Sequence, residues 1–268
     1  MVRRPAVAGL FYPSDPAELD RTVTGLLAEA GDAPAEHAVA IVAPHAGYVY
    51  SGAIAASVYA RVRVPSSAIV IAPNHTGLGA RAAVITSGRF AMPGGDVEID
   101  ERLAGTVRDV CGLTDDADAH RREHALEVHL PFLRARNPDV RIVPIVLGGL
   151  SFEAIVRIGH GLASAIHACG RDVLLVASTD MSHYIAAEEA RGLDRLALDR
   201  LEALDARGLY DVVRAKDITM CGFIPTCVVL IAASELGAKH ARLVRYGNSG
   251  DVSGDYQRVV GYASAVVA

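Results

Sequence analysis

The hydrophobic pattern of the chain contains three short runs of β-branched and aliphatic residues, each of which leads into a loop with a histidine. The runs and their histidines are 40–43 with His45, 68–72 with His75, and 173–177 with His183. Such runs, bounded by turn residues and separated by long segments of helical spacing, are typical of buried parallel strands. Ligands bind beyond the carboxyl ends of the strands in open α/β sheets, so the three histidines are predicted to share one site.

The rest of the pattern predicts helices and strands along the whole chain. Helical spacing covers 16–30, 53–62, 100–110, 123–135, 151–167, 187–204 and 221–236, the last starting as a loop; strands are predicted at 141–147, 241–246 and 258–267, and extended hairpin-like structure at 79–97. Asp15 caps the first helix, Pro131 interrupts the fourth, and Ser151 caps the fifth. Since no change of composition marks a linker, the fold class is α/β, predicted as a single three-layer domain over 1–268 with a central, mostly parallel sheet.

Composition and charge indicate a soluble globular chain. The 268 residues are 51% hydrophobic and 21% charged, with a formal net charge of −5. The arginines are dispersed, so no surface for nucleic acid is predicted. The longest apolar stretch, 227–233, is far shorter than the roughly 20 residues that cross a bilayer, and no membrane role is expected. Four cysteines without CxxC spacing, and a start without a cationic and apolar leader, predict a reducing, cytoplasmic location.

His45 and His75 occupy equivalent positions after their strands. Each follows a proline, and Gly47 or Gly77 lies two residues further on, where the backbone can turn tightly. Either histidine alone would be interpreted as a loop residue hydrogen-bonded to backbone. Their repetition favours a functional site, with ring nitrogens presented at the edge of the sheet.

Asp180 and His183 share the loop after the third run, at i, i+3 spacing. A carboxylate beside an imidazole fixes its tautomer and raises its basicity, which suits a general acid/base or a pair that supports a metal ligand. The alternative is that Asp180 caps the next helix.

A further group of polar residues, His124, Glu127 and His129, lies in the segment 123–129. Helical periodicity places His124 and Glu127 on one face and His129 elsewhere. At least one of the three is therefore expected to be structural.

Cys221 differs from the other cysteines because it directly precedes a long apolar helix, whose amide N–H groups would favour a thiolate. Cys111, Cys169 and Cys227 are expected to behave as small hydrophobic side chains. Two imidazoles with one thiolate or carboxylate, and open positions, are typical of a catalytic non-haem metal site, whereas a closed structural zinc site needs a fourth ligand.

Four motifs together carry a resemblance to a known family. They are PHAGYVYSG at 44–52, EHALEVHLP at 123–131, STDMSH at 178–183 and MCG at 220–222, with further similar segments at 4–13 and 260–264. The sequence resembles the Memo family (mediator of cell motility), whose prokaryotic members are called AmmeMemoRadiSam system protein B. The resemblance covers essentially the whole chain.

The resemblance implies a fold similar to the class III extradiol ring-cleavage dioxygenases, which hold Fe(II) with two histidines and a glutamate. Carried onto this sequence, the histidine ligands are His45 and His75, and the third position is Cys221. Asp180 and His183 match the inner-pocket pair of the family, with His183 as the acid/base candidate. Family members are linked to copper and iron binding, animal members to motility signalling and phosphopeptide binding, and prokaryotic members, by gene neighbourhood, to a radical SAM protein and a third small protein.

Two departures from the family pattern limit what is carried over. Cys221 replaces a hard oxygen ligand by a soft sulfur, which favours Cu(I), zinc or thiolate-ligated iron and argues against the standard extradiol route. Phe11 stands where members often carry tryptophan, and the residues after Cys221 are less polar than in the animal proteins. Peptide recognition is therefore not carried over.

The sequence and the resemblance together predict a metal-dependent redox enzyme, dioxygenase-like, in which His45, His75 and Cys221 bind non-haem iron or copper. His183, oriented by Asp180, would move protons. Fe(II) is the first expectation, with copper or zinc as alternatives, and the cleft is expected to take a small molecule or a peptide. Two other functions fit the same residues: a non-catalytic peptide-, partner- or metal-binding module on a relic dioxygenase fold, and a zinc-dependent hydrolase. The residues expected to line the pocket are Tyr48, Tyr50, Asn74, His129, Phe11 and Tyr12.

Overall fold

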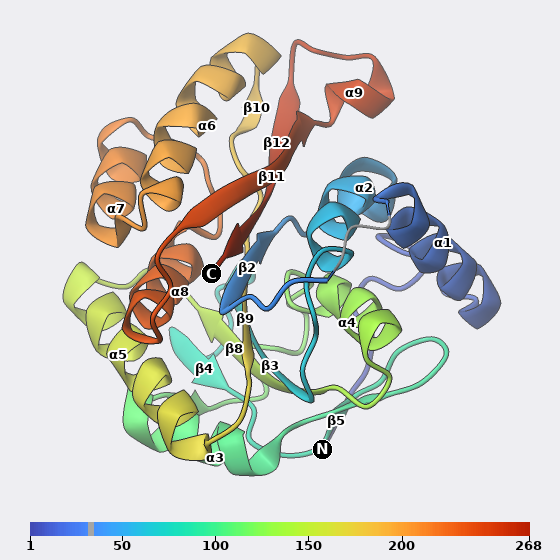
Figure 1. Cartoon of the computed structure of the whole chain (residues 1–268). Coiled ribbons are helices and arrows are strands. Elements are labelled where there is room, and N and C mark those ends of the chain that lie inside the picture. The colour runs from blue at the N-terminus through green and yellow to red at the C-terminus, as the bar shows by residue number, and fades with distance from the viewer. Residues whose placement is uncertain (32–34) are drawn as a thin grey trace.

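Four parallel strands form the centre of a nine-stranded sheet in the computed structural model, which describes residues 1–31 and 35–268 (Figure 1). In spatial order they are β2 (Ala40–Ala43), β9 (Leu174–Ser178), β3 (Ser67–Pro73) and β8 (Arg141–Leu147). All their residues except Arg141 are buried, because helices cover both faces of the sheet and both faces carry apolar side chains. The three runs predicted as buried parallel strands are confirmed.

Antiparallel strands extend the sheet on both sides of this centre. β12 (Val259–Val267) pairs with β2, with β11 (Ala241–Asn248) and with β10 (His183–Ile185). On the other side β8 pairs with β4 (Ala82–Val84), which pairs in turn with β7 (Thr114–Asp115). The two strands predicted for the tail are confirmed as β11 and β12.

A second, three-stranded sheet lies near the N-terminus and consists of β1 (Val2–Arg3), β5 (Arg89–Phe90) and β6 (Val97–Glu98). The segment 79–97, predicted as hairpin-like, is thus divided, since β4 belongs to the large sheet and β5 to the small one. Only the β5–β6 pair is a local antiparallel pairing.

Helices on both faces make the fold three-layered (Figure 1). One face is covered by α3 (Glu101–Cys111), α5 (Phe152–Cys169) and α8 (Phe223–Glu235), and the other by α1 (Pro16–Glu29), α2 (Tyr48–Tyr59) and α4 (Leu130–Arg136). α6 (Ala187–Glu202) packs on β10, β11 and β12, α7 (Ala206–Ala215) on α6 and α8, and the short α9 (Gly250–Ser253) follows β11. One continuous apolar cluster joins these elements, and the predicted three-layer α/β class is confirmed.

Two helices begin elsewhere than the pattern predicts. α2 starts at Tyr48 rather than at residue 53, with Gly47 as its N-cap and with Tyr48 and Ser51 of its first turn buried. The segment 123–135 is not one interrupted helix: a 3-10 turn, Glu127–His129, leads into α4, and Pro131 sits in the first turn of that helix, where a missing N–H costs nothing. The strand β10 and the helix α7 were not predicted.

The N-terminal segment is anchored by one buried carboxylate. Glu127 is fully buried, and its Oε2 accepts hydrogen bonds from the guanidinium of Arg3 and from the Ala6 N–H (2.7 Å). Its Oε1 accepts from the Val7 N–H (3.1 Å) and the Tyr12 hydroxyl (2.5 Å). Glu127 is therefore structural, as expected for at least one of the polar residues in 123–129.

Candidate metal centre

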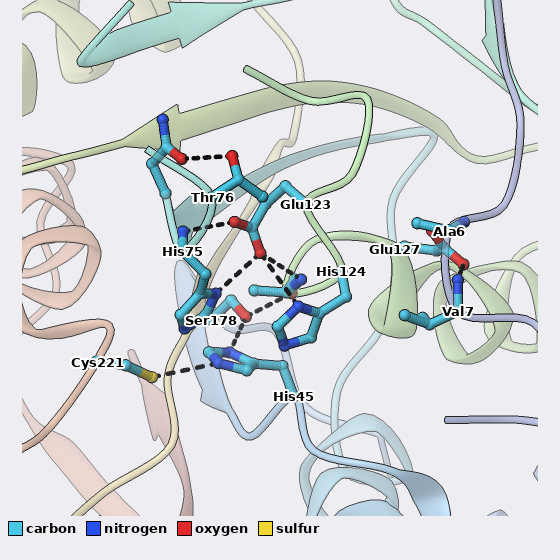
Figure 2. A network of polar contacts seen from close by, with 12 residues as sticks. Ala6, Val7, His45, His75, Thr76, Glu123, His124, Glu127, Ser178 and Cys221 are labelled. Carbon is cyan, nitrogen blue, oxygen red and sulfur yellow. Dashed lines mark hydrogen bonds and ion pairs between the residues drawn. The ribbon is translucent and has the colours of Figure 1, made fainter. Parts of the chain in front are cut away.

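Three side chains from distant parts of the chain meet at the carboxyl edge of the central strands. His45 lies two residues after β2, His75 two residues after β3, and Cys221 two residues before α8. One ligand atom from each residue lies within 4.8 Å of the others, and the Sγ of Cys221 is 3.2 Å from the Nε2 of His45 (Figure 2). The structure thus brings together the three predicted metal ligands.

Both imidazoles are oriented by a partner on Nδ1, which leaves Nε2 available. His45 Nδ1 is 2.7 Å from the Oγ of Ser178, and His75 Nδ1 is 2.9 Å from Oε1 of Glu123 (Figure 2). Glu123 also accepts the backbone N–H of His75 (2.6 Å). A carboxylate or hydroxyl on one ring nitrogen fixes the tautomer in which the other nitrogen can bind a metal.

The hydrogen bonds of the Ser178 hydroxyl determine which tautomer His45 adopts. Its hydroxyl can donate once, and it donates to the carbonyl of Ala125 (2.6 Å). It must therefore accept from both His45 Nδ1 and His129 Nε2, which is 2.8 Å away. His129 Nδ1 is then an acceptor for the Tyr59 hydroxyl (3.1 Å). Burial and the neighbouring His75 and His124 hold the pKa of His45 well below its ordinary value, so its ring is neutral.

Asp180 faces His45 rather than His183. Its Oδ1 accepts the backbone N–H of His45 (2.7 Å), and its Oδ2 lies 4.0 Å from His45 Nε2. Burial raises the pKa of Asp180 to about 7, although the hydrogen bond from His45 opposes the shift. This carboxyl can therefore gain or lose a proton near neutral pH.

His183 is oriented by Thr219, which corrects the prediction that Asp180 orients it. Its Nδ1 donates to the Thr219 carbonyl (2.9 Å), and its backbone N–H to the Thr219 hydroxyl (2.7 Å). Across residues 1–31 and 35–268 no hydrogen bond joins Asp180 to His183. Burial lowers the pKa of His183, so the neutral ring keeps Nε2 as an acceptor.

Cys221 carries a thiol rather than the predicted thiolate when no metal binds it. Burial, followed by the charge of Asp180, raises the pKa of this thiol well above its ordinary value. Desolvation thus outweighs the amide dipoles at the start of α8. A metal ion would have to displace this proton, so metal affinity is expected to rise with pH. Among the other cysteines, Cys227 is buried as expected, whereas Cys111 and Cys169 are half-buried.

His124 and Glu123 complete the surroundings of His75. The His124 ring stacks on that of His75 (centroids 4.8 Å apart, planes at 19°) and meets the edge of Phe11 at 4.9 Å. Glu123, Ser178 and Thr219 were not predicted as partners of the histidines. Glu123 and Ser178 each lie in a motif used for the family resemblance, but nothing in those motifs assigns them to a particular ring.

A cleft of about 610 Å³ opens beside two of the three predicted ligands, His75 and Cys221, and is also lined by Asn74. Of the side chains expected to line a pocket, only Asn74 borders this cleft. Its Oδ1 accepts from the Gly77 N–H and its Nδ2 donates to the Leu78 carbonyl, both at 2.9 Å, so the side chain mainly closes the loop after β3.

The other expected pocket residues lie elsewhere. Tyr12, Tyr48 and His129 are buried and their polar atoms are bonded to Glu127, the Val128 carbonyl and Ser178, so they are structural. Phe11 borders a separate groove on the N-terminal side, and Tyr50 is exposed in the first turn of α2. Of these aromatic rings, those of Tyr12 and Tyr48 thus serve packing.

Gly222 packs against the end of β9 with no room for a side chain. A Cβ there would lie 2.1 Å from the Ser178 carbonyl oxygen and 2.5 Å from the Thr179 Cβ. We expect Gly222→Ala to displace Cys221 from His45, to weaken metal binding by about tenfold or more, and to destabilise the fold by about 1–3 kcal/mol. Metal titration and denaturant unfolding measure the two effects.

Gly192→Ala in α6 is the matched control for this substitution. A Cβ at Gly192 meets nothing within 4 Å, so the change should leave metal affinity unaltered and stability equal or slightly higher. Equal metal affinities in the two variants would contradict the role given to Gly222.

The fold and the site define the class: a three-layer α/β protein with two histidines and one cysteine gathered where its parallel strands end. The chain belongs to the family described as Memo-like protein, whose model matches residues 3–266. It is 41% identical over 274 residues to a MEMO1 family protein of Methanothermobacter thermautotrophicus, covering 98% of this chain and 99% of that one. MEMO1 family proteins of Aquifex aeolicus (41% identical, 99% of this chain and 98% of that one) and Methanopyrus kandleri (39% identical, 99% of each) are also similar.

These matches confirm the resemblance found from the motifs. In the part of the chain that the structure describes, no helix is long and apolar enough to cross a membrane.

Proposed function

We propose that this protein is a metal-dependent redox enzyme in which His45, His75 and Cys221 hold one iron or copper ion. The observation that carries the proposal is the convergence of the three ligand atoms within 4.8 Å, with both imidazoles already held by Nδ1. Such preparation of a ligand set is typical of metal sites. The family match supports a shared fold, and the names of the relatives give no reaction.

The donor set fits a redox metal. Two imidazoles suit iron, copper and zinc, and a thiolate adds preference for the softer ions. Three protein ligands beside a cleft leave coordination positions open to other molecules. A bound iron or copper ion would supply one-electron chemistry and Lewis acidity at this edge of the sheet.

The chain itself supplies two groups that can move protons. Asp180, with a pKa of about 7, can accept or release a proton beside His45 at neutral pH. His183 offers an unprotonated Nε2 because Nδ1 donates to the Thr219 carbonyl. A base poised near the working pH is the most effective one. The two groups act separately, since different partners orient them.

The test is an anaerobic titration of metal-free protein with Fe(II) and Cu(I). Wild type should bind one equivalent, and Cys221→Ser should bind more than about tenfold more weakly, since a thiolate ligand is replaced by a poor one. Cys169→Ser is the matched control, because Cys169 lies at the far end of α5, and it should bind as wild type does. Nitric oxide added to the iron form should give a nitrosyl EPR signal if coordination positions are open.

Two results would redirect the proposal. Full metal affinity in a His45→Ala, His75→Ala double variant would overturn it. If the protein binds zinc tightly and consumes no oxygen when iron or copper is supplied, the zinc-dependent hydrolase is favoured. If it binds no metal at all, the partner-binding module is favoured.

A further inference from the structure

The cleft beside the metal centre extends away from His75 and Cys221 to a cationic side chain on α7. Its walls come from the loops after β3 and β8 and from the starts of α5 and α8. The lining includes His75, Cys221, Tyr210, Arg214, Phe223 and Ile224. The cleft therefore extends from two of the proposed metal ligands to Arg214, and part of its wall between them is apolar.

Arg214 is the only fully charged side chain that the described part of the chain contributes to this lining, although the chain as a whole is acidic. The sequence has 31 Asp and Glu against 26 Lys and Arg, yet no carboxylate of a described residue borders the cleft. Among residues 1–31 and 35–268, none of the ion pairs involves Arg214. Two turns earlier on the same helix, Arg207 pairs with Asp211 at 2.7 Å. The charge of Arg214 is thus left without a carboxylate partner from the described residues.

The guanidinium of Arg214 is held in place by an aromatic ring. Its centre lies 5.4 Å from the Tyr210 ring centroid, and Nη1 donates to the Tyr210 hydroxyl at 3.3 Å. The Tyr210 ring in turn packs against Phe223 at 5.9 Å between centroids. An arginine stacked in this way loses less freedom when it binds a planar anion.

The start of α8 adds a second source of positive potential to the cleft. Its N-cap is Gly222, which offers no capping side chain, and its first turn contains no acidic residue. Phe223 and Ile224 of this turn line the cleft. The uncapped amide dipoles favour negative charge in front of them.

We infer that the substrate of this site is a small molecule with an apolar body and a carboxylate, and that Arg214 binds the carboxylate. This inference rests on the proposed function, because it assumes that the substrate reacts at the metal centre. Tyr210, Phe223 and Ile224 contact the apolar body, and the opposite end of the substrate faces His75 and Cys221. A carboxylate matches the fork of donors of a guanidinium, whereas a neutral amide does not.

The experiment compares two probes that differ in charge at one end: 3,4-dihydroxybenzoate and 3,4-dihydroxybenzamide. Binding of each is measured by calorimetry under anaerobic conditions, with metal-free protein and with the Fe(II) form. Wild type should prefer the acid by about tenfold, as expected for a charge-assisted hydrogen bond at a partly exposed site. Arg214→Gln should lose this preference, mainly through weaker binding of the acid.

Arg207→Gln is the matched control, since Arg207 lies on the same exposed helix but outside the cleft, and it should keep the preference for the acid. Equal binding of acid and amide by wild type, or an unchanged preference in Arg214→Gln, would overturn the inference. The Fe(II) affinity of Arg214→Gln separates the two proposals. If this affinity equals that of wild type, failure of the substrate inference does not contradict the proposed metal centre. If the metal-free protein prefers the acid, the substrate inference holds even when the protein binds no metal.

Discussion

Glu127→Gln is expected to lower the free energy of unfolding by about 3–5 kcal/mol, because it leaves the buried guanidinium of Arg3 without its counter-charge. Both side chains are at most 2% exposed. Four donors point at the two carboxylate oxygens, from Arg3, the Ala6 and Val7 amides and the Tyr12 hydroxyl. A glutamine has one acceptor oxygen, so its NH₂ group must face two of these donors. Urea unfolding followed by circular dichroism measures the loss.

Asp211→Asn provides the matched control for a charge-neutralising change. Asp211 pairs with Arg207 at 2.7 Å on the exposed face of α7, and such exposed i, i+4 pairs contribute less than about 1 kcal/mol. A Glu127→Gln protein as stable as Asp211→Asn would show that the buried carboxylate does not anchor the N-terminal segment. Arg3 also donates to the carbonyls of His120 and Glu123. Loss of the anchor should therefore also disturb the segment that orients His75.

When the pH falls from 7 to 5, the free energy of unfolding of wild type is expected to fall by about 2 kcal/mol more than that of His129→Gln. Burial lowers the pKa of His129 to about 3, whereas the unfolded chain has the ordinary value near 6.5. Between these values the unfolded chain binds a proton that the folded protein does not. Stability therefore falls as the pH drops below about 6.5, and this contribution stops changing below pH 3.

The side-chain amide that His129→Gln introduces can replace both ring contacts, since it can donate to Ser178 and accept from Tyr59. Unfolding free energies at several pH values give the slope for each protein. His37→Gln, in which the replaced ring is exposed rather than buried, is the control variant. Identical slopes in wild type and His129→Gln would mean that His129 is not held as a buried neutral ring.

The strands that carry the ligands could be predicted from the sequence because a parallel strand covered on both faces must be apolar throughout. That signal is local, and it placed His45 and His75 at one edge of the sheet. The partners of these rings could not be predicted in the same way. Glu123 reaches His75 through a loop without a repeating pattern, and Ser178 meets His45 across two neighbouring strands. Both contacts depend on tertiary packing.

Two chemical expectations failed for related physical reasons. The helix start after Cys221 argued for a thiolate, but the sequence does not show how deeply the sulfur is buried, and burial dominates its pKa. The i, i+3 spacing argued for an Asp180–His183 pair. The chain instead enters β10 at His183, where pairing with β12 sets the backbone direction and the ring meets Thr219.

The position of β12 also affects how the protein folds during its synthesis. This strand, latest in the sequence, pairs with β2, so that Ala265 lies beside Val42, and it also holds β10 and β11. While the chain is being synthesised, the edge of β2 that β12 later covers stays open to wrong partners until β12 has been made. Contacts between such distant segments also slow folding. A nascent chain is therefore expected to need protection from aggregation until β12 is made.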